Sequence, residues 1–152
     1  MSNVARVLGS GGNTQGIPSK SDDLFSTDLW DGAGATATTV TNGIDLSNEG
    51  GMVWIKSRTN PGTGNFHHLV DSVRGQSGGF HKALHSNGTE AENTYSSSSN
   101  GGVSSFNTNG FTISPGSNGN HFLNSNTYTY VSWTFRKAPK FFDVVQYTGT
   151  GS

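Results

Sequence analysis

The chain contains no cysteine among its 152 residues. Disulfide bonds and thiolate metal sites are therefore excluded. Charge is also scarce, because charged residues make up 12% of the chain and the formal net charge is −1. Nucleic-acid-binding proteins owe their affinity for phosphate to clustered lysine and arginine, so this balance argues against a nucleic-acid partner.

Long apolar runs are missing as well. No segment is long enough to span a membrane, and residues 1–24 lack the apolar stretch of a secretory signal peptide. We therefore expect a protein that is made in the cytoplasm, has no membrane partner and is used without Sec export. Contact with a cell surface would require another route of release, such as lysis.

What the chain has instead is a large share of small polar residues. Gly, Ser, Thr and Asn together form about half of it, and these residues suit turns and polar strands better than helix interiors. The apolar surface is concentrated in nine Phe, four Tyr and three Trp. Because each aromatic side chain buries a large area, we expect a thin, aromatic-rich core under polar loops rather than disorder.

Short strand patterns separated by turns run along the chain, with no convincing helix. The segments with the best strand patterns are 35–40, 51–56, 66–73, 80–85, 103–113, 128–135 and 141–147. Asn109 and Gly110 lie between Phe106 and Phe111 and predict a hairpin, because both tolerate a positive φ. The pattern indicates an all-β fold, an antiparallel β-sandwich of the jelly-roll or concanavalin-like kind, whose strand order the sequence leaves open.

The chain divides into two parts. Residues 25–152 are predicted to form the sandwich, and residues 1–24 an extended N-terminal arm. Val4, Val7 and Leu8 form a short apolar patch in this arm. Either the arm is a frayed terminus, or the patch docks on a partner protein or a neighbouring subunit, which is the interpretation that we carry forward.

The last clearly alternating segment puts Val131, Trp133 and Phe135 on one face, which we assign to the core. The opposite face holds Tyr130, Ser132 and Thr134. We predict that Tyr128 and Tyr130 point away from the core and contact a partner subunit, with a second sheet or a sugar as the alternatives. The apolar pattern around Trp133 also places this tryptophan in the core, as it does Trp54.

The residue types needed for catalysis or metal binding are present, but not in a recognisable arrangement. The histidines that invite a metal interpretation are His67, His68, His81 and His85. No His-Glu-x-x-His motif occurs, and on a strand His81 and His85 would lie about 13 Å apart, too far to share one ion. No nucleophile elbow, phosphate loop or EF-hand spacing occurs either. We therefore predict no catalytic residue, no cofactor, no metal ion and no enzymatic activity.

Segment 141–147 has a strong strand pattern and is followed at once by a stretch rich in Gly and Thr. A strand of this kind needs neighbours on both sides, because its backbone groups otherwise stay unpaired. We expect that it pairs with another chain or that the natural protein continues beyond it.

Five strings of residues occur in an order that resembles a known family. They are FSTDLWDG at 25–32, NGIDL at 42–46, EGGMVWIKSR at 49–58, SFNTNGF at 105–111 and VSWTFRKAPKFFDVV at 131–145. Together they are similar to a module common in structural and tail-fibre-like proteins of marine phages, including cyanophages. The resemblance implies a concanavalin/laminin-G-like sandwich that is repeated along longer chains, and it supplies no catalytic residue.

The resemblance also implies a role. We expect a structural virion protein of a phage tail, assembled in the host cytoplasm, in which the arm anchors a homotrimeric fibre to other tail proteins of the adaptor or nozzle kind. Members of the family continue past the string at 147–151 into further β modules, so residues 25–152 would be the first module of a longer fibre. The alternatives are a glycan-binding module for the host receptor and a capsid decoration protein.

Overall fold

The computed structural model describes residues 21–59, 66–92, 98–117 and 122–150. Nearly all regular structure in these ranges is β, and each strand runs antiparallel to its neighbours. The elements are η1 (Ser21–Asp23), β1 (Phe25–Asp31), β2 (Thr38–Thr41), β3 (Gly51–Ser57), β4 (His68–Asp71), β5 (Gln76–Ser77), β6 (Phe80–His81), β7 (Ala83–His85), β8 (Gly102–Asn107), β9 (Gly110–Ser114) and β10 (Thr129–Arg136). The predicted all-β class is confirmed.

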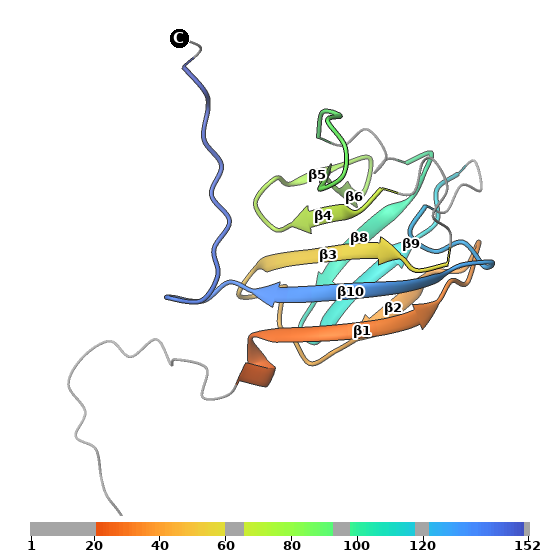
Figure 1. Ribbon diagram of the computed structural model, residues 1–152, viewed down its shortest axis with the longest axis horizontal. Helices are drawn as coiled ribbons and strands as arrows, with labels where there is room; N and C mark the ends of the chain where they lie inside the picture. The colour runs from red at the N-terminus through yellow and green to blue at the C-terminus, as the bar shows by residue number, and fades with distance from the viewer. Residues whose placement is uncertain (1–20, 60–65, 93–97, 118–121, 151–152) are drawn as a thin grey trace, which may run out of the picture.

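The strands form two stacked sheets. The larger sheet has the order β1-β10-β3-β4-β7, and the smaller has the order β2-β9-β8. Figure 1 shows the larger sheet in front of the smaller one. The pair β5-β6 forms a small hairpin, which contacts β8 through the rings of His81 and Phe106, 4.2 Å apart. The arrangement is the predicted antiparallel sandwich, and its strand order places the first and last described strands, β1 and β10, side by side.

The core lies between the two sheets. Its fully buried side chains come from both, and from the loop after β2; they are Ile44, Leu46, Val53, Ile55, Val70, Val103, Phe111, Ile113 and Tyr130. Trp30 packs against this cluster, with its ring 5.5 Å from that of Tyr130 and 6.1 Å from that of Phe111. One tryptophan therefore bridges β1 and β10 of the larger sheet and β9 of the smaller one.

The predicted hairpin joins β8 to β9, but its turn residues are Thr108 and Asn109, Gly110 begins β9, and Asn109 does not have the positive φ that the prediction assumed. Phe106 pairs with Phe111 across it, as the sequence pattern requires. Gly110 has a φ of 143°, and a Cβ atom there would collide with the carbonyl oxygen of Val40 in β2. Glycine is thus required both for the turn and for the close approach of the neighbouring strand.

The predicted assignment of the two faces of β10 is wrong. Tyr130, Ser132 and Thr134 are fully buried between the sheets, whereas Trp133 and Phe135 lie on the opposite face and are only partly buried. Alternation alone could not decide the matter, because each face of this strand carries a bulky aromatic residue.

Two features make the polar face of β10 suitable for the interior. Ser132 and Thr134 are small, and the register places them beside Ile55 and Val53 of β3, which supply apolar bulk. One of the two hydroxyl groups is hydrogen-bonded: the side-chain amide of Asn42 donates to the Thr134 hydroxyl at 2.8 Å, whereas the Ser132 hydroxyl has no partner in the described chain. Burial of a hydroxyl costs little when it keeps a hydrogen bond.

Other expected elements differ as well. β1 was not among the predicted strands, and the predicted strand 80–85 is divided between β6 and β7. Segment 141–147 is not a strand, since only Phe142 makes a bridge, with Ala138. The predicted arm, with Val4, Val7 and Leu8, lies almost wholly outside the described residues. Within the described ranges, no helix has the length and apolar character of a membrane span.

Candidate interaction site

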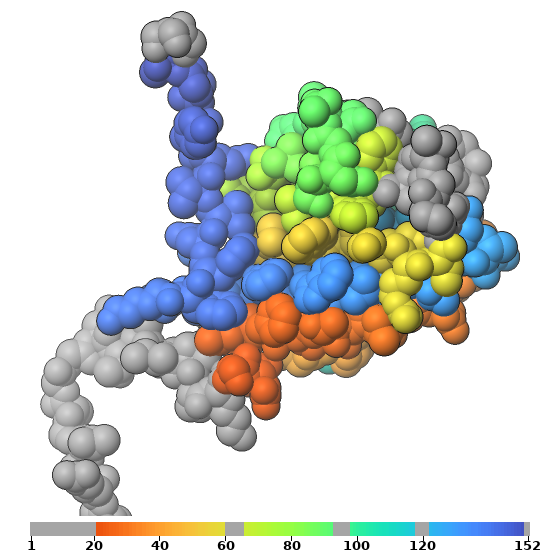
Figure 2. Space-filling model, viewed as in Figure 1, coloured from red at the N-terminus to blue at the C-terminus, as the bar shows by residue number. Residues whose placement is uncertain are grey.

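One face of the five-stranded sheet packs on the core, and we call the other its open face. Side chains that alternate with the core residues form a row across it, because the register places Thr27, Trp133, Trp54, Leu69 and Leu84 opposite one another on successive strands. Figure 2 views this face, where β1, β10 and β3 lie side by side. No other described strand belongs to this sheet, and Trp133, Trp54, Leu69 and Leu84 each keep part of their surface exposed on this face.

Two tryptophans occupy the middle of this row. Trp54 and Trp133 are cross-strand neighbours, with ring centroids 5.2 Å apart and planes tilted by 48°. Both are partly buried rather than enclosed, so the prediction that they lie in the core is wrong. The indole Nε1 of Trp54 is shielded from solvent and makes no hydrogen bond to the described chain. The exposed parts of these two tilted indoles offer apolar surface to another protein or to a sugar ring.

A second aromatic group lies where β10 ends. The ring of Phe135 contacts those of Phe25 and Phe142, at centroid distances of 5.0 and 5.2 Å. Phe25 keeps 38% of its surface exposed, and the neighbouring Phe141 keeps 45%. These side chains extend the apolar part of the open face to the edge of the sheet.

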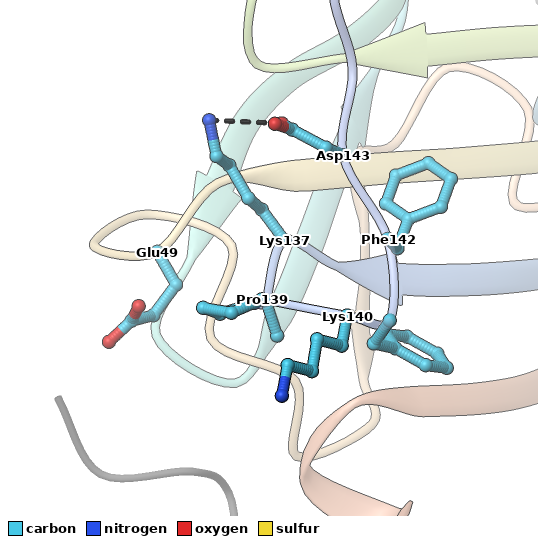
Figure 3. A pocket seen from close by; sticks show the side chains of 8 residues that line it. Glu49, Lys137, Pro139, Lys140, Phe142 and Asp143 are labelled. Carbon is cyan, nitrogen blue, oxygen red and sulfur yellow. Dashed lines mark ion pairs between the residues drawn. The ribbon is translucent and has the colours of Figure 1, made fainter. Parts of the chain in front are cut away.

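A cavity of about 590 Å³ opens beside this aromatic group. Its lining comes from Glu49, Lys137, Ala138, Pro139, Lys140, Phe141, Phe142 and Asp143 (Figure 3). The turn that shapes it is closed by two hydrogen bonds, from the Ala138 N–H to the Phe142 carbonyl at 3.0 Å and from the Phe142 N–H to the Ala138 carbonyl at 3.2 Å. Lys140 has a φ of 64° in this turn, a backbone conformation that non-glycine residues seldom adopt.

The charges around the cavity are balanced. Lys137 forms an ion pair with Asp143 at 3.0 Å, drawn as the dashed line in Figure 3, and the hydrogen bond from Lys137 lowers the pKa of that carboxyl group. Glu49 lies 3.5 Å from Arg136. The lining holds two lysines and two carboxylates, and no histidine, serine, threonine or cysteine. Its chemistry is suited to binding polar backbone and apolar side chains.

The histidines meet in a way that the sequence did not reveal. His68 and His85 are opposite each other on β4 and β7, with ring centroids 4.7 Å apart. Burial, reinforced by His85 and His67, lowers the pKa of His68 to about 3. Glu90 lies 3.6 Å from His85. Across the described ranges no group of three His, Cys, Asp or Glu residues has the geometry to hold a metal ion.

The residues predicted to contact a partner do not form one surface. Tyr130 is fully buried, and its hydroxyl oxygen accepts a hydrogen bond from the Ser125 N–H at 2.9 Å, so this part of the prediction is wrong. Tyr128 is partly buried and packs against the core cluster. The surface that the structure leaves open instead carries Trp133, which the sequence pattern had assigned to the interior. The sequence around Trp133 contains no local signal that distinguishes an exposed position on this strand from a buried one.

The fold and the open face together define a domain of the all-β, antiparallel sandwich class that presents aromatic side chains on one sheet. The chain belongs to a family described as Domain of unknown function (DUF7483), whose model matches residues 20–152. No curated protein and no solved structure matches it.

Proposed function

We propose that this protein is a structural component of a phage tail, the N-terminal region of a tail fibre that anchors the fibre to the tail. In this proposal residues 1–24 dock on tail proteins of the adaptor or nozzle kind, and the sandwich forms the base of a homotrimeric fibre. The protein reaches the virion by assembly in the host cytoplasm and carries out no chemistry of its own.

One observation of the geometry supports an assembly role above all. The open face, the aromatic group at its edge and the last described residues expose large apolar side chains, among them Leu29 at 62%, Val145 at 77% and Tyr147 at 90%. Apolar surface of this kind is characteristic of proteins that are covered by a partner in use. The phage assignment itself comes from the strings at 25–32 and 131–145, which resemble tail-fibre-like modules.

The test is a cryo-electron microscopy structure of intact phage particles that contain this protein. We expect three copies of the sandwich around the fibre axis at the tail, with residues 1–24 enclosed by other tail proteins. Copies spread over the capsid surface would contradict the anchor role and favour a decoration protein. Absence of the chain from purified particles, measured by mass spectrometry, would contradict both.

A glycan-binding module is the second candidate, and Trp54 and Trp133 on the open face favour it. Sugar rings bind to exposed indole faces through apolar contact, and the flanking strands carry hydroxyl groups for hydrogen bonds. The measurement is binding of the purified protein to host surface polysaccharide, compared between Trp133→Ala and Leu29→Ala, a control on the same face. Loss of at least tenfold in affinity for Trp133→Ala alone would support this role, and no binding by the unmodified protein would end it.

A further inference from the structure

β1 is an open edge of the larger sheet. The Arg136 N–H donates to the Leu24 carbonyl at 2.8 Å, and the Gly32 N–H donates to the Tyr128 carbonyl at 2.9 Å, so both ends of β1 bond toward β10. Because backbone groups alternate sides in an antiparallel strand, the residues between them at odd positions direct their N–H and C=O groups away from β10. These residues are Phe25, Thr27, Leu29 and Asp31. No other described strand pairs with them.

β1 carries two aspartates, Asp28 and Asp31, but otherwise lacks the usual protection of an edge strand. It contains no proline and no lysine, and its seven residues pair with β10 without a bulge. The other outer strands of the two sheets are less suitable for strand addition, because β7 and β2 have three and four residues and β8 has a bulge between Val103 and Ser105. A long, regular edge without proline or a bulge is a template for another strand.

The last described residues are a strand without a sheet. Residues 143–150 make no backbone-to-backbone hydrogen bond with the described chain, although the segment 141–147 has the composition of a strand. Val145 and Tyr147 are 77% and 90% exposed. Figure 2 shows this segment as a narrow column that stands clear of the sandwich, and Figure 1 shows that it runs away from β1 of its own chain.

The charges beside the two segments are complementary. The acidic residues in and before β1 are Asp22, Asp23, Asp28 and Asp31, and residues 21–31 contain no lysine or arginine. The basic residues just before the exposed segment are Arg136, Lys137 and Lys140. Arg136 and Lys137 already pair with Glu49 and Asp143 of their own chain, so the complementary charge rests on Lys140. Opposite charges at two surfaces favour their approach and disfavour pairing of like surfaces. A second copy of the chain therefore offers β1 a partner of suitable length and suitable charge.

We infer that the segment 143–147 of one copy, which makes no backbone-to-backbone hydrogen bond in the described chain, adds as an antiparallel strand to the β1 edge of another. The register that we infer pairs Asp143 with Leu29, Val145 with Thr27 and Tyr147 with Phe25, so that no two acidic residues are directly opposite and the last pair is aromatic. Each copy donates one strand and accepts one, so the contact joins copies head to tail and closes into a ring or extends as a filament. This inference rests on the two segments alone and is independent of the virion role.

Two proline variants of the full chain test the hydrogen bonds. In the inferred register the Val145 N–H points at β1 and the Gln146 N–H points away, and neither donates within the described chain. Size-exclusion chromatography with light scattering should show the unmodified protein as species heavier than the 16.0 kDa monomer. Val145→Pro should weaken association at least tenfold, and Gln146→Pro, the matched control, should leave it nearly unchanged because an edge strand tolerates proline there.

The lack of cysteine allows the register to be tested directly. Thr27→Cys and Val145→Cys are made as separate variants and mixed under oxidising conditions, because opposed residues of a hydrogen-bonded pair lie about 5.5 Å apart, within the range of a disulfide. We expect a mixed disulfide dimer, and much less of one when Thr41→Cys on β2 replaces Thr27→Cys. A monomeric unmodified protein at about 200 µM (well above the roughly micromolar affinities of specific contacts), equal effects of the two prolines, or no preference for Thr27→Cys would each overturn the inference. Thermal unfolding of every variant separates these outcomes from misfolding.

Discussion

Tyr130 illustrates how this domain places a polar aromatic residue at its centre. Its ring stacks on that of Trp30 at 5.5 Å, and its hydroxyl oxygen accepts the Ser125 N–H at 2.9 Å. Burial raises the pKa of Tyr130 to about 12, because the phenolate would lose its hydration. The residue therefore stays neutral and gives the loop before β10 a fixed attachment to the core.

Replacement of Tyr130 with phenylalanine should lower the free energy of unfolding by about 1 kcal/mol, because the Ser125 N–H loses its acceptor in a shielded position. The measurement is urea unfolding followed by tryptophan fluorescence. Tyr147→Phe is the control, since that residue is 90% exposed and should leave stability unchanged. Equal values for the two variants would show that the hydrogen bond contributes nothing.

His68 makes the stability of the domain depend on pH. Its pKa is about 3 in the folded chain, below the usual value of 6.5, so the folded state holds it neutral while the unfolded state takes up a proton. The stabilisation is present above pH 6.5 and is lost as the pH falls toward 3. From this group alone, the free energy of unfolding should be about 2 kcal/mol lower at pH 5 than at pH 7.

The comparison of His68→Gln with the unmodified protein isolates this effect. Chemical unfolding at several pH values should show that the free energy of unfolding falls between pH 7 and pH 5 by about 2 kcal/mol less in the variant than in the unmodified protein. His67→Gln provides the control, because His67 is adjacent in sequence but only partly buried, and most of the decline should remain. If His68→Gln keeps the full decline, another group is responsible.

At the scale of the element, the hairpin between β8 and β9 depends on one glycine. Gly110→Ala should destabilise the protein by about 2 kcal/mol or more, because its φ is 143° and the new Cβ would meet the carbonyl oxygen of Val40. Gly43→Ala is the matched control, with a φ of 80° but no atom within 4 Å of the added Cβ, and should cost about 1 kcal/mol. Thermal unfolding measures both, and equal losses would contradict the steric explanation.

Elements with a local signal were predictable from the sequence. The apolar run 51–56 became β3, and the Asn-Gly pair placed β8 and β9. β1 gave no clear pattern, because each of its two faces carries both polar and apolar side chains, as is common for a strand at the edge of a sheet. Segment 141–147 gave a strong pattern but no strand, since a strand also requires a neighbour and the described chain supplies none.

At the scale of the whole molecule, the two sheets are held together by side chains that reach across the core. Trp30→Ala should lower the free energy of unfolding by about 3 kcal/mol, because this ring contacts both Tyr130 and Phe111. Trp133→Ala removes a ring from the open face, where its ring contact is Trp54, and should cost about 1 kcal/mol. Urea unfolding of both variants tests this order, and a larger loss for Trp133→Ala would reverse it.

The candidate site was predictable only in part. The sequence indicated an aromatic-rich sandwich with an unsatisfied segment at 141–147, and both features belong to the surfaces discussed above. The particular residues were not predictable, because the open face, the cavity beside Phe142 and the pair His68–His85 each combine side chains from strands that are distant in sequence.

The sequence by itself determined the all-β class, the antiparallel turns and the supply of aromatic residues, because these follow from composition and from spacings of a few residues. The tertiary structure alone decided which face of β10 is interior and which strand forms the free edge. Both depend on the neighbours that a strand acquires. Val53 and Ile55 of β3 made a polar face of β10 suitable for the core, and the position of β1 at the end of the sheet left its outer backbone groups without a partner among the described strands.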